Sequence, residues 1–426
     1  MTPMQLLARS QYVFYLLFTI DIFLAGSGAD YFGYDLALRK VFFAAFAILS
    51  VVLYFSKDDR DRRAIVVLML AFLLVVFVWV LAIPATVLRG NMRYAISDST
   101  PLLAAGIALL SLNFPVDKNN WRSIRNVSHA ALLAFSVLHI ILYVTFSISP
   151  ELGESARNLL AGIWEPAGME ENLYVFLVPL NESSHRIYFG SSFLLLLGLY
   201  FSFQAYRRPI SENNWVHALF FLIFFGALWT TNTRSLLLGA VAFIPLAFGL
   251  ARLLPRLPFN VLTISALLVV PFLASFILSP VLDPDFLSAI GLSREGSDDL
   301  RSEQFRPLLA AFLRSPLIGT GFGSGIDLVR SEVTPYAYEL TVLAILMKVG
   351  VFGVLAGCLL LAHVFQLRGV IGQRHFPRKL APLYALYFSF ILSCFFNPYL
   401  FGFFGTFFLL FVIYEYAFLM ASNADD

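Results

Sequence analysis

The sequence predicts an all-α, polytopic integral membrane protein, and three features of its composition lead to that fold class. Of its 426 residues, 59% are hydrophobic and only 13% are charged, whereas soluble domains carry about 25% charged residues. The mean hydropathy is +0.79. The apolar residues also form long continuous runs, whereas the strands of an outer-membrane barrel would give short alternating segments. Long runs predict helices, because a helix satisfies its own backbone hydrogen bonds in lipid.

About twelve apolar segments are long enough to span a membrane, since a spanning helix needs about 20 residues. These segments are residues 12–29, 36–55, 64–83, 100–116, 127–148, 188–205, 216–231, 235–251, 259–280, 336–365, 381–397 and 400–420. We interpret the first as a retained helix rather than a signal peptide, because no convincing small-residue cleavage site follows it. The spans are expected to form a single transmembrane domain over residues 1–426.

The distribution of basic residues predicts the orientation of the spans. If the N-terminus is cytoplasmic, Lys and Arg concentrate in short cytoplasmic loops and are sparser in the longer loops outside. We therefore expect both termini to be cytoplasmic. Two external loops are long, residues 149–187 and 281–335, and loops of this length usually have a function.

The second external loop contains a predicted surface helix over residues 301–314. Its apolar residues recur at helical spacing. They are Phe305, Leu308, Leu309 and Phe312. We expect a short amphipathic helix at the outer membrane surface. It should end at Ser315-Pro316, because the proline ring disfavours a helical conformation of the residue before it.

Arg234 lies in a turn of almost no length between two predicted spans, which places it at the outer membrane boundary. Arginines in such places often extend towards lipid headgroups. Alternatively, the planar guanidinium could grip a phosphate through paired hydrogen bonds. The polar neighbours Thr231, Asn232 and Thr233 favour the phosphate interpretation.

Further external arginines could form a positive rim over a membrane-embedded cavity and attract an anionic, lipid-linked substrate. They are Arg89, Arg93, Arg186, Arg301 and Arg306. For Arg301 and Arg306 the alternative is an ordinary solvated loop.

The stretch from Gly319 to Gly325 has glycine at every second position. It lacks the Gly-Lys-Ser/Thr ending and the strand–turn–helix context of a nucleotide-binding loop. Two interpretations stay open for glycines such as Gly319 and Gly321. They allow tight turns, or their amides form a concavity that binds an anion.

Glu339, at the start of a long apolar segment, is the strongest candidate for chemistry, and the adjacent Tyr338 is expected to contact substrate. A partly desolvated carboxylate could serve as a general base. The alternative is that Glu339 only stabilises the helix N-terminus, worth about 0.3–1 kcal/mol.

Lys348 is off the Glu339 face by spacing, so it is expected to pair elsewhere. The downstream glycines are expected to let another helix approach closely. They are Gly350, Gly353 and Gly357.

No metal, cofactor or nucleic acid is expected. Cys358 and Cys394 lie in apolar runs, which disfavours a disulfide, and the Cys/His spacing is not that of a metal site.

A lipid or polysaccharide transporter would need charged groups along a path through the membrane and broken helices in repeated positions. The acids in or near the spans are too scattered for such a path. They are Asp21, Asp30, Asp98 and Glu415.

The chain between Arg301 and Gly353 resembles the core of the O-antigen polymerase and O-antigen ligase superfamily of membrane glycosyltransferases. The matching residues are Arg301, Phe305, Pro316-Leu-Ile-Gly319-Thr-Gly321, Glu339 and Gly350-Val-Phe-Gly353. The turn around Arg234 resembles the second arginine motif of that family. The resemblance covers residues 185–365 and implies a GT-C-like membrane fold with a structured periplasmic loop.

The resemblance implies polymerisation of oligosaccharide repeat units carried on undecaprenyl diphosphate, at the periplasmic face of the bacterial inner membrane. Arg234 and Arg301 would hold the diphosphate, helped by Arg186 or Arg306, in an inverting transfer without metal. The ligases of the family have a histidine where this chain has Glu339, so we favour a polymerase over a ligase acting on lipid A-core or protein. The expected partners are the lipid-linked donor, the glycan acceptor, membrane lipid and, optionally, a chain-length regulator.

Overall fold

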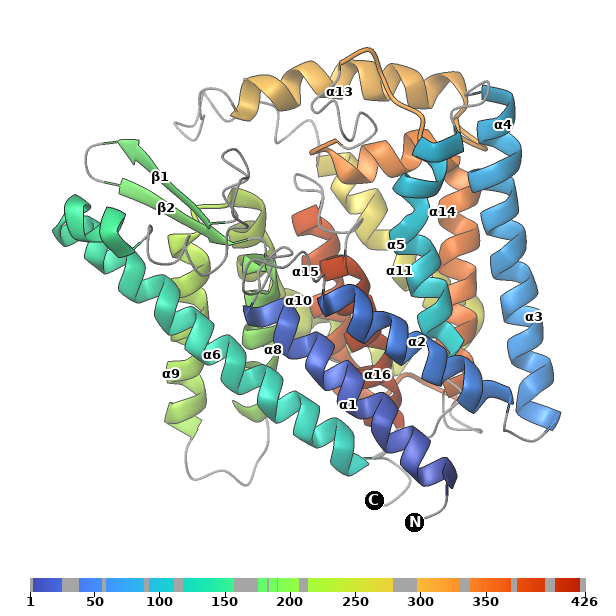
Figure 1. Ribbon diagram of the computed structural model, residues 1–426, viewed down its shortest axis with the longest axis horizontal. Coiled ribbons are helices and arrows are strands. Elements are labelled where there is room, and N and C mark those ends of the chain that lie inside the picture. Colours follow the sequence, from blue (N-terminus) through green and yellow to red (C-terminus); the bar gives the residue numbers. More distant parts are fainter. Residues whose placement is uncertain are drawn as a thin grey trace. The chain divides into compact units, whose positions relative to one another are not determined.

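The computed structural model describes residues 3–24, 38–55, 59–87, 92–110, 118–156, 175–181, 184–189, 191–206, 214–278, 297–328, 338–368, 374–394 and 403–421. These residues contain fourteen α-helices and a single two-stranded sheet (Figure 1). They divide into two compact units, one made of Met1–Ser56 and Phe114–Phe248, the other of Lys57–Asn113 and Gly249–Asp426. The single-domain organisation stays a prediction.

The first unit is a group of apolar helices with a hairpin at one end of its longest helix (Figure 1). Its elements are α1 (Pro3–Leu24), α2 (Leu38–Phe55), α6 (Lys118–Ile148), β1 (Val175–Asn181), β2 (Ser184–Phe189), a 3₁₀ turn (Ser192–Leu194), α8 (Leu195–Tyr206), α9 (Asn214–Thr230) and most of α10 (Arg234–Leu253). Helix α1 packs against α2 and α6, and α6, α8 and α9 pack against one another. The fully buried Trp121 lies 6.0 Å from the ring of Tyr15 and joins α6 to α1.

The β1–β2 hairpin corrects one expected span boundary. Strand β1 pairs antiparallel with β2 from Val175 opposite Phe189 to Asn181 opposite Ser184, with an irregularity after Pro179. The hairpin lies in the segment expected to be a loop over 149–187. The span expected to begin at residue 188 begins as strand, and its α-helix starts at Leu195. Contacts of β2 with α6 and α9 support the hairpin, which would be only marginally stable alone.

The second unit contains the remaining helices. They are α3 (Asp59–Val76), a π-helical stretch (Phe77–Ala82), α4 (Ile83–Val87), α5 (Met92–Leu110), a 3₁₀ turn (Leu254–Arg256), α11 (Val261–Leu278), α13 (Ser297–Arg314), α14 (Thr341–Arg368), a second 3₁₀ turn (Arg378–Leu380), α15 (Ala381–Cys394) and α16 (Phe403–Ala421). Asn260 caps α11, because its side-chain oxygen accepts the amide of Thr263 at 2.8 Å. Cys358 and Cys394 are buried and carry no disulfide.

Helix α14 is not continuous. It changes direction at Gly350, which has φ +63° and ψ −175° (Figure 1). Helix α13 packs along the segment of α14 that precedes the break, through an apolar cluster that also includes the residues just before the helix. The buried members of this cluster are Leu308, Phe312, Tyr338, Leu340, Val342, Leu343, Ala344 and Met347. The amphipathic helix predicted over 301–314 is confirmed and begins four residues earlier, at Ser297.

Each predicted apolar segment overlaps a helix of the described chain. Among the residues that the structure describes, four helical stretches are long and apolar enough to cross a membrane: Val66–Ala85, Asn119–Ile148, Arg234–Arg256 and Thr341–Phe365. Several long apolar helices indicate a multi-pass membrane protein. The number of about twelve crossings and the orientation stay predictions.

Candidate functional site

The residues expected to form the site are divided between the two units. Arg186 lies in β2 and Arg234 begins α10, both in the first unit. The second unit holds Arg93, Arg301, Arg306, Gly319, Gly321, Tyr338 and Glu339. Arg89 lies outside the described residues, and Arg301 is placed only as part of helix α13.

In the first unit, Arg186 is bound to the turn that leads into Arg234. Its Nε donates to the carbonyl oxygen of Thr231 at 3.2 Å, and its Nη2 donates to the hydroxyl of Thr233 at 3.2 Å. The turn is sharp, because Asn232 has φ +44°, a conformation that Asn tolerates better than most residues. Arg234 follows directly as the first residue of α10 and is half-buried. The same turn is therefore bound by Arg186 and followed in the chain by Arg234, two of the arginines expected to bind phosphate.

The hydrogen bonds of this turn are made within the protein itself. The hydroxyl of Thr231 donates to the carbonyl of Leu228 at 2.7 Å and accepts the amide of Thr233 at 3.2 Å. The carbonyl of Thr233 accepts the amide of Leu237 at 3.0 Å, which starts the helical pattern of α10. Helix α10 thus presents its N-terminus, the positive end of its dipole, beside Arg186.

In the second unit, helix α13 is tied to the residues before α14 at Glu339. The backbone amide of Glu339 donates to the side-chain oxygen of Gln304 at 3.1 Å. Gln304 is fully buried and lies three residues after Arg301 in α13, about one helical turn. Glu339 itself is half-buried. Arg301 and Glu339, far apart in the sequence, therefore belong to one small region of this unit.

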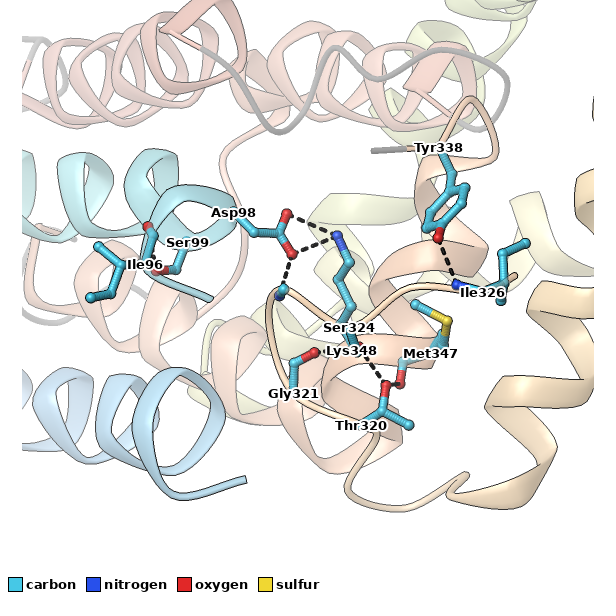
Figure 2. Close-up of polar contacts among 11 residues, drawn as sticks. Ile96, Asp98, Ser99, Thr320, Gly321, Ser324, Ile326, Tyr338, Met347 and Lys348 are labelled. Carbon is cyan, nitrogen blue, oxygen red and sulfur yellow. Dashed lines mark hydrogen bonds and ion pairs between the residues drawn. The ribbon is translucent and has the colours of Figure 1, made fainter. Parts of the chain in front are cut away.

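The long helix begins later than expected, at Thr341 rather than residue 336. Glu339 consequently precedes the helix, and Leu340 supplies the first helical carbonyl, which the amide of Ala344 contacts at 2.9 Å. Tyr338 is buried, and its hydroxyl accepts the amide of Ile326 at 2.7 Å (Figure 2). Burial raises the pKa of Tyr338, so this hydroxyl stays protonated at neutral pH.

The glycine-rich segment is built into the break of α14. Thr320 and Gly321 donate their amides to the carbonyls of Met347 and Lys348, at 2.9 and 2.7 Å. In the opposite direction, Val351 donates to Pro316 at 2.9 Å, and a further bond joins the next residue to the same segment. Backbone groups that the break removes from the helix are thus satisfied by this segment, as buried backbone requires.

Glycine is required at these positions because the backbone is left-handed and crowded. Gly319, Gly321 and Gly323 all have φ between +71° and +85°. A Cβ on Gly319 would lie 2.3 Å from the carbonyl oxygen of Lys348. The amides of Gly319 and Gly321 bond to protein carbonyls, which favours the turn interpretation over the anion-binding one at these two residues.

The same contacts correct the expectation for the glycines of α14. Gly350 faces the backbone of the segment before Gly321 rather than another helix, because its Cβ would lie 2.4 Å from the carbonyl oxygen of Leu317. A Cβ on Gly353 would lie 2.4 Å from the side chain of Val349 in the same helix and 3.1 Å from Trp79 in the π-helical stretch. At Gly357 nothing lies within 4 Å.

A buried ion pair joins α5, α14 and the glycine-rich segment. The ammonium of Lys348 lies 2.8 and 2.7 Å from the two carboxylate oxygens of Asp98. Only 3% and 5% of these side chains are exposed. Figure 2 shows the side chains of Asp98 and Lys348 pointing toward each other. The amide of Gly323 donates to the same carboxylate at 2.8 Å. Lys348 thus pairs away from Glu339, as its spacing predicts.

Two polar groupings of the described residues are not foreseen from the sequence. One is the Asp98–Lys348 pair. Its only trace in the sequence is a charged residue in each of two apolar helices. The other surrounds His139, which is fully buried in α6 and contacts Ser192 and Thr230. A histidine in an apolar helix, by itself, does not reveal such partners.

Among the residues that the structure describes, no group of three or more His, Cys, Asp or Glu side chains could hold a metal ion. Comparisons with protein-family models, with curated proteins and with solved structures find no match. The arginines, the carboxylate and the backbone geometry of the two units are therefore the features that bear on function.

Proposed function

We propose that this protein is a membrane glycosyltransferase that polymerises oligosaccharide repeat units carried on undecaprenyl diphosphate, at the periplasmic face of the bacterial inner membrane. The observation that carries the proposal is the hydrogen bond between Gln304 and the amide of Glu339. It joins the helix of Arg301 to the segment of Glu339. A cation for a diphosphate and a carboxylate for a proton are the two groups that such a transfer requires.

The carboxylate of Glu339 is the proposed general base. It would take the proton of an acceptor sugar hydroxyl as that oxygen attacks the anomeric carbon of the donor glycan. The new carbon–oxygen bond forms while the bond from the anomeric carbon to the diphosphate oxygen breaks. The diphosphate leaves with the bonding electron pair, and the configuration at the anomeric carbon inverts. Glu339 is half-buried and precedes α14, so part of its side chain is open to an acceptor.

Arginines are proposed to stabilise the leaving diphosphate. Negative charge on the diphosphate grows in the transition state, so fixed guanidinium groups lower the barrier. In the unit of Glu339, Arg301 is the proposed contact, with Arg306 of the same helix as a helper. In the other unit, Arg234 is the proposed phosphate-binding residue, with Arg186 as its helper. A guanidinium has five N–H donors. Holding the turn before α10 through two of them is therefore compatible with a role of Arg186 in binding phosphate.

The geometry of α14 also bears on the rival transporter function. Transporters use broken helices whose unwound backbone binds substrate or ions, and α14 is broken at Gly350. Here the carbonyls of Met347 and Lys348 and the amide of Val351 bond to the segment 316–321. This arrangement favours a structural break over an ion site.

The test is polymerisation by purified protein supplied with an undecaprenyl-diphosphate-linked repeat unit. Wild type should build a ladder of glycans in detergent, where there is no membrane to cross. Glu339→Gln and Arg301→Ala should each lower the rate by at least about 100-fold, in line with the loss of a general base or a charge-stabilising group. Glu303→Gln and Arg314→Ala are matched controls, because both side chains are exposed on α13, and they should retain the wild-type rate.

Each result separates the candidate functions. A ladder that both site variants lose, while remaining folded, supports a polymerase with these residue roles. Transfer of the glycan to lipid A-core without a ladder would make the protein a ligase. No transfer under either condition would overturn the glycosyltransferase proposal and favour a transporter.

A further inference from the structure

A chain of hydrogen bonds in the interior of the first unit runs from the strand that carries Arg186 to the residue before the turn that binds its guanidinium. His139 stands at its centre on α6, fully buried. Its Nε2 lies 3.2 Å from the hydroxyl of Ser192, just after β2, and its Nδ1 lies 3.4 Å from the hydroxyl of Thr230, the last residue of α9. One side chain therefore links three elements.

The direction of each bond follows from the outer members of the chain. The hydroxyl of Ser192 accepts the amide of Phe189 at 2.8 Å, which leaves its own proton to donate to Nε2 of His139. The hydroxyl of Thr230 donates to the carbonyl of Ala227 at 2.8 Å, so it accepts from Nδ1 of His139. These contacts assign a neutral imidazole with its proton on Nδ1.

Both ends of this chain connect directly to the predicted phosphate-binding arginines. At one end, Phe189 is the last residue of the strand that carries Arg186. At the other, Thr230 is followed by the turn whose Thr231 and Thr233 accept the guanidinium of Arg186. The α6–His139 link thus fixes the strand and the turn relative to each other, and with them Arg186 and the start of α10.

The surroundings of His139 exclude a role in contacting substrate directly. Its ring packs edge-on against Phe135 and Phe189, at centroid distances of 4.7 and 4.9 Å. We propose that His139 is a positioning residue, which acts through Arg186 and the turn before α10 to hold them in the orientation that binds a lipid-linked diphosphate. This inference rests on the proposed function for its ligand.

The experiment is a double-mutant cycle with binding of undecaprenyl diphosphate to purified protein in detergent as the readout. His139→Phe removes both hydrogen bonds and keeps an aromatic ring between its neighbours. Arg186→Ala removes the arginine. We expect His139→Phe to raise the Kd about tenfold, and the double variant to bind no more weakly than Arg186→Ala alone, because coupled residues are not additive.

Phe135→Leu is the matched control. It loosens packing against the same ring, lowers thermal stability and leaves the hydrogen-bonded chain intact, so the Kd should not change. If His139→Phe lowers stability as this control does and leaves the Kd unchanged, or if its effect adds to that of Arg186→Ala, the positioning role is overturned.

A second readout separates this inference from the proposed function. The same cycle is measured by unfolding without ligand, where positioning requires that the effects of His139→Phe and Arg186→Ala on stability are non-additive. Coupling in unfolding without any binding of undecaprenyl diphosphate by wild type would refute the proposed ligand and support the positioning link. Binding by wild type without coupling in either readout would refute the positioning link alone.

Discussion

Replacing Lys348 with Met removes the ammonium group that lies 2.7 Å from the carboxylate of Asp98 while retaining the length of the side chain. Since only 5% of the Asp98 side chain is exposed, water cannot replace the lost partner. The amide of Gly323 remains, at 2.8 Å. The variant must therefore bury a carboxylate with one backbone donor or take up a proton.

Each of these two outcomes for the carboxylate limits how much stability the variant loses. Removing one partner of a buried pair costs about 3–5 kcal/mol. Taking up a proton at pH 7 costs an ordinary carboxyl group about 4 kcal/mol, which sets a ceiling. The bond from Gly323 offsets about 1 kcal/mol. We therefore expect Lys348→Met to lower the free energy of unfolding by about 3 kcal/mol, or roughly 100-fold in the equilibrium constant.

The assay is reversible unfolding of the purified protein in mixed micelles with increasing denaturing detergent. The series comprises wild type, Lys348→Met, Asp98→Asn and the double variant. The double variant removes both charges and should be more stable than either single variant, because no unpaired ion is buried.

A loss below about 1 kcal/mol for Lys348→Met would refute the reasoning, because an interaction that weak is typical of exposed pairs. So would a double variant as unstable as the sum of the two single variants.

Three further predictions concern the backbone and the arginine turn. Gly350→Ala should destabilise the protein by about 2 kcal/mol or more, because its backbone is left-handed and a Cβ would lie 2.4 Å from a carbonyl oxygen. Gly357→Ala is the control: nothing lies within 4 Å of its Cβ position, so the change should be neutral or stabilising by about 1 kcal/mol. Equal effects of the two variants in the same unfolding assay would argue against the break in α14. Tyr338→Phe should cost about 1–2 kcal/mol and speed hydrogen exchange of the Ile326 amide, which the hydroxyl accepts at 2.7 Å; unchanged exchange would contradict this contact. Arg186→Lys keeps the charge but loses the planar fork, so glycan polymerisation should fall about tenfold, and a wild-type rate would show that charge alone suffices.

The helices and the region of the candidate site are largely foreseeable from local features of the sequence. An apolar run of about 20 residues has few alternatives to helix, and each predicted run overlaps a described helix. The spacing of Phe305, Leu308 and Phe312 identifies α13 for a similar reason. Its end before Ser315-Pro316 also follows from the backbone restriction before proline.

Other features depend on partners that local patterns do not contain. The hairpin lies in a segment whose strands are held by each other and by α6 and α9. Gly350 has the same sequence signature as a helix-packing glycine, yet its partner is the backbone of Leu317. His139 is one histidine in an apolar helix until Ser192 and Thr230 are placed beside it.

Hydropathy and side-chain spacing, which act over one or two helical turns, are enough to determine a chain of long apolar helices, as in a multi-pass membrane protein, with a glycine-rich segment between two of them. Tertiary structure alone decides that Asp98 pairs with Lys348, 250 positions away, and that Gln304 meets the amide of Glu339, 35 positions away. The physical reason is that a buried charge or amide must find a partner, but the sequence specifies only the need. Which partner satisfies it depends on how the helices pack.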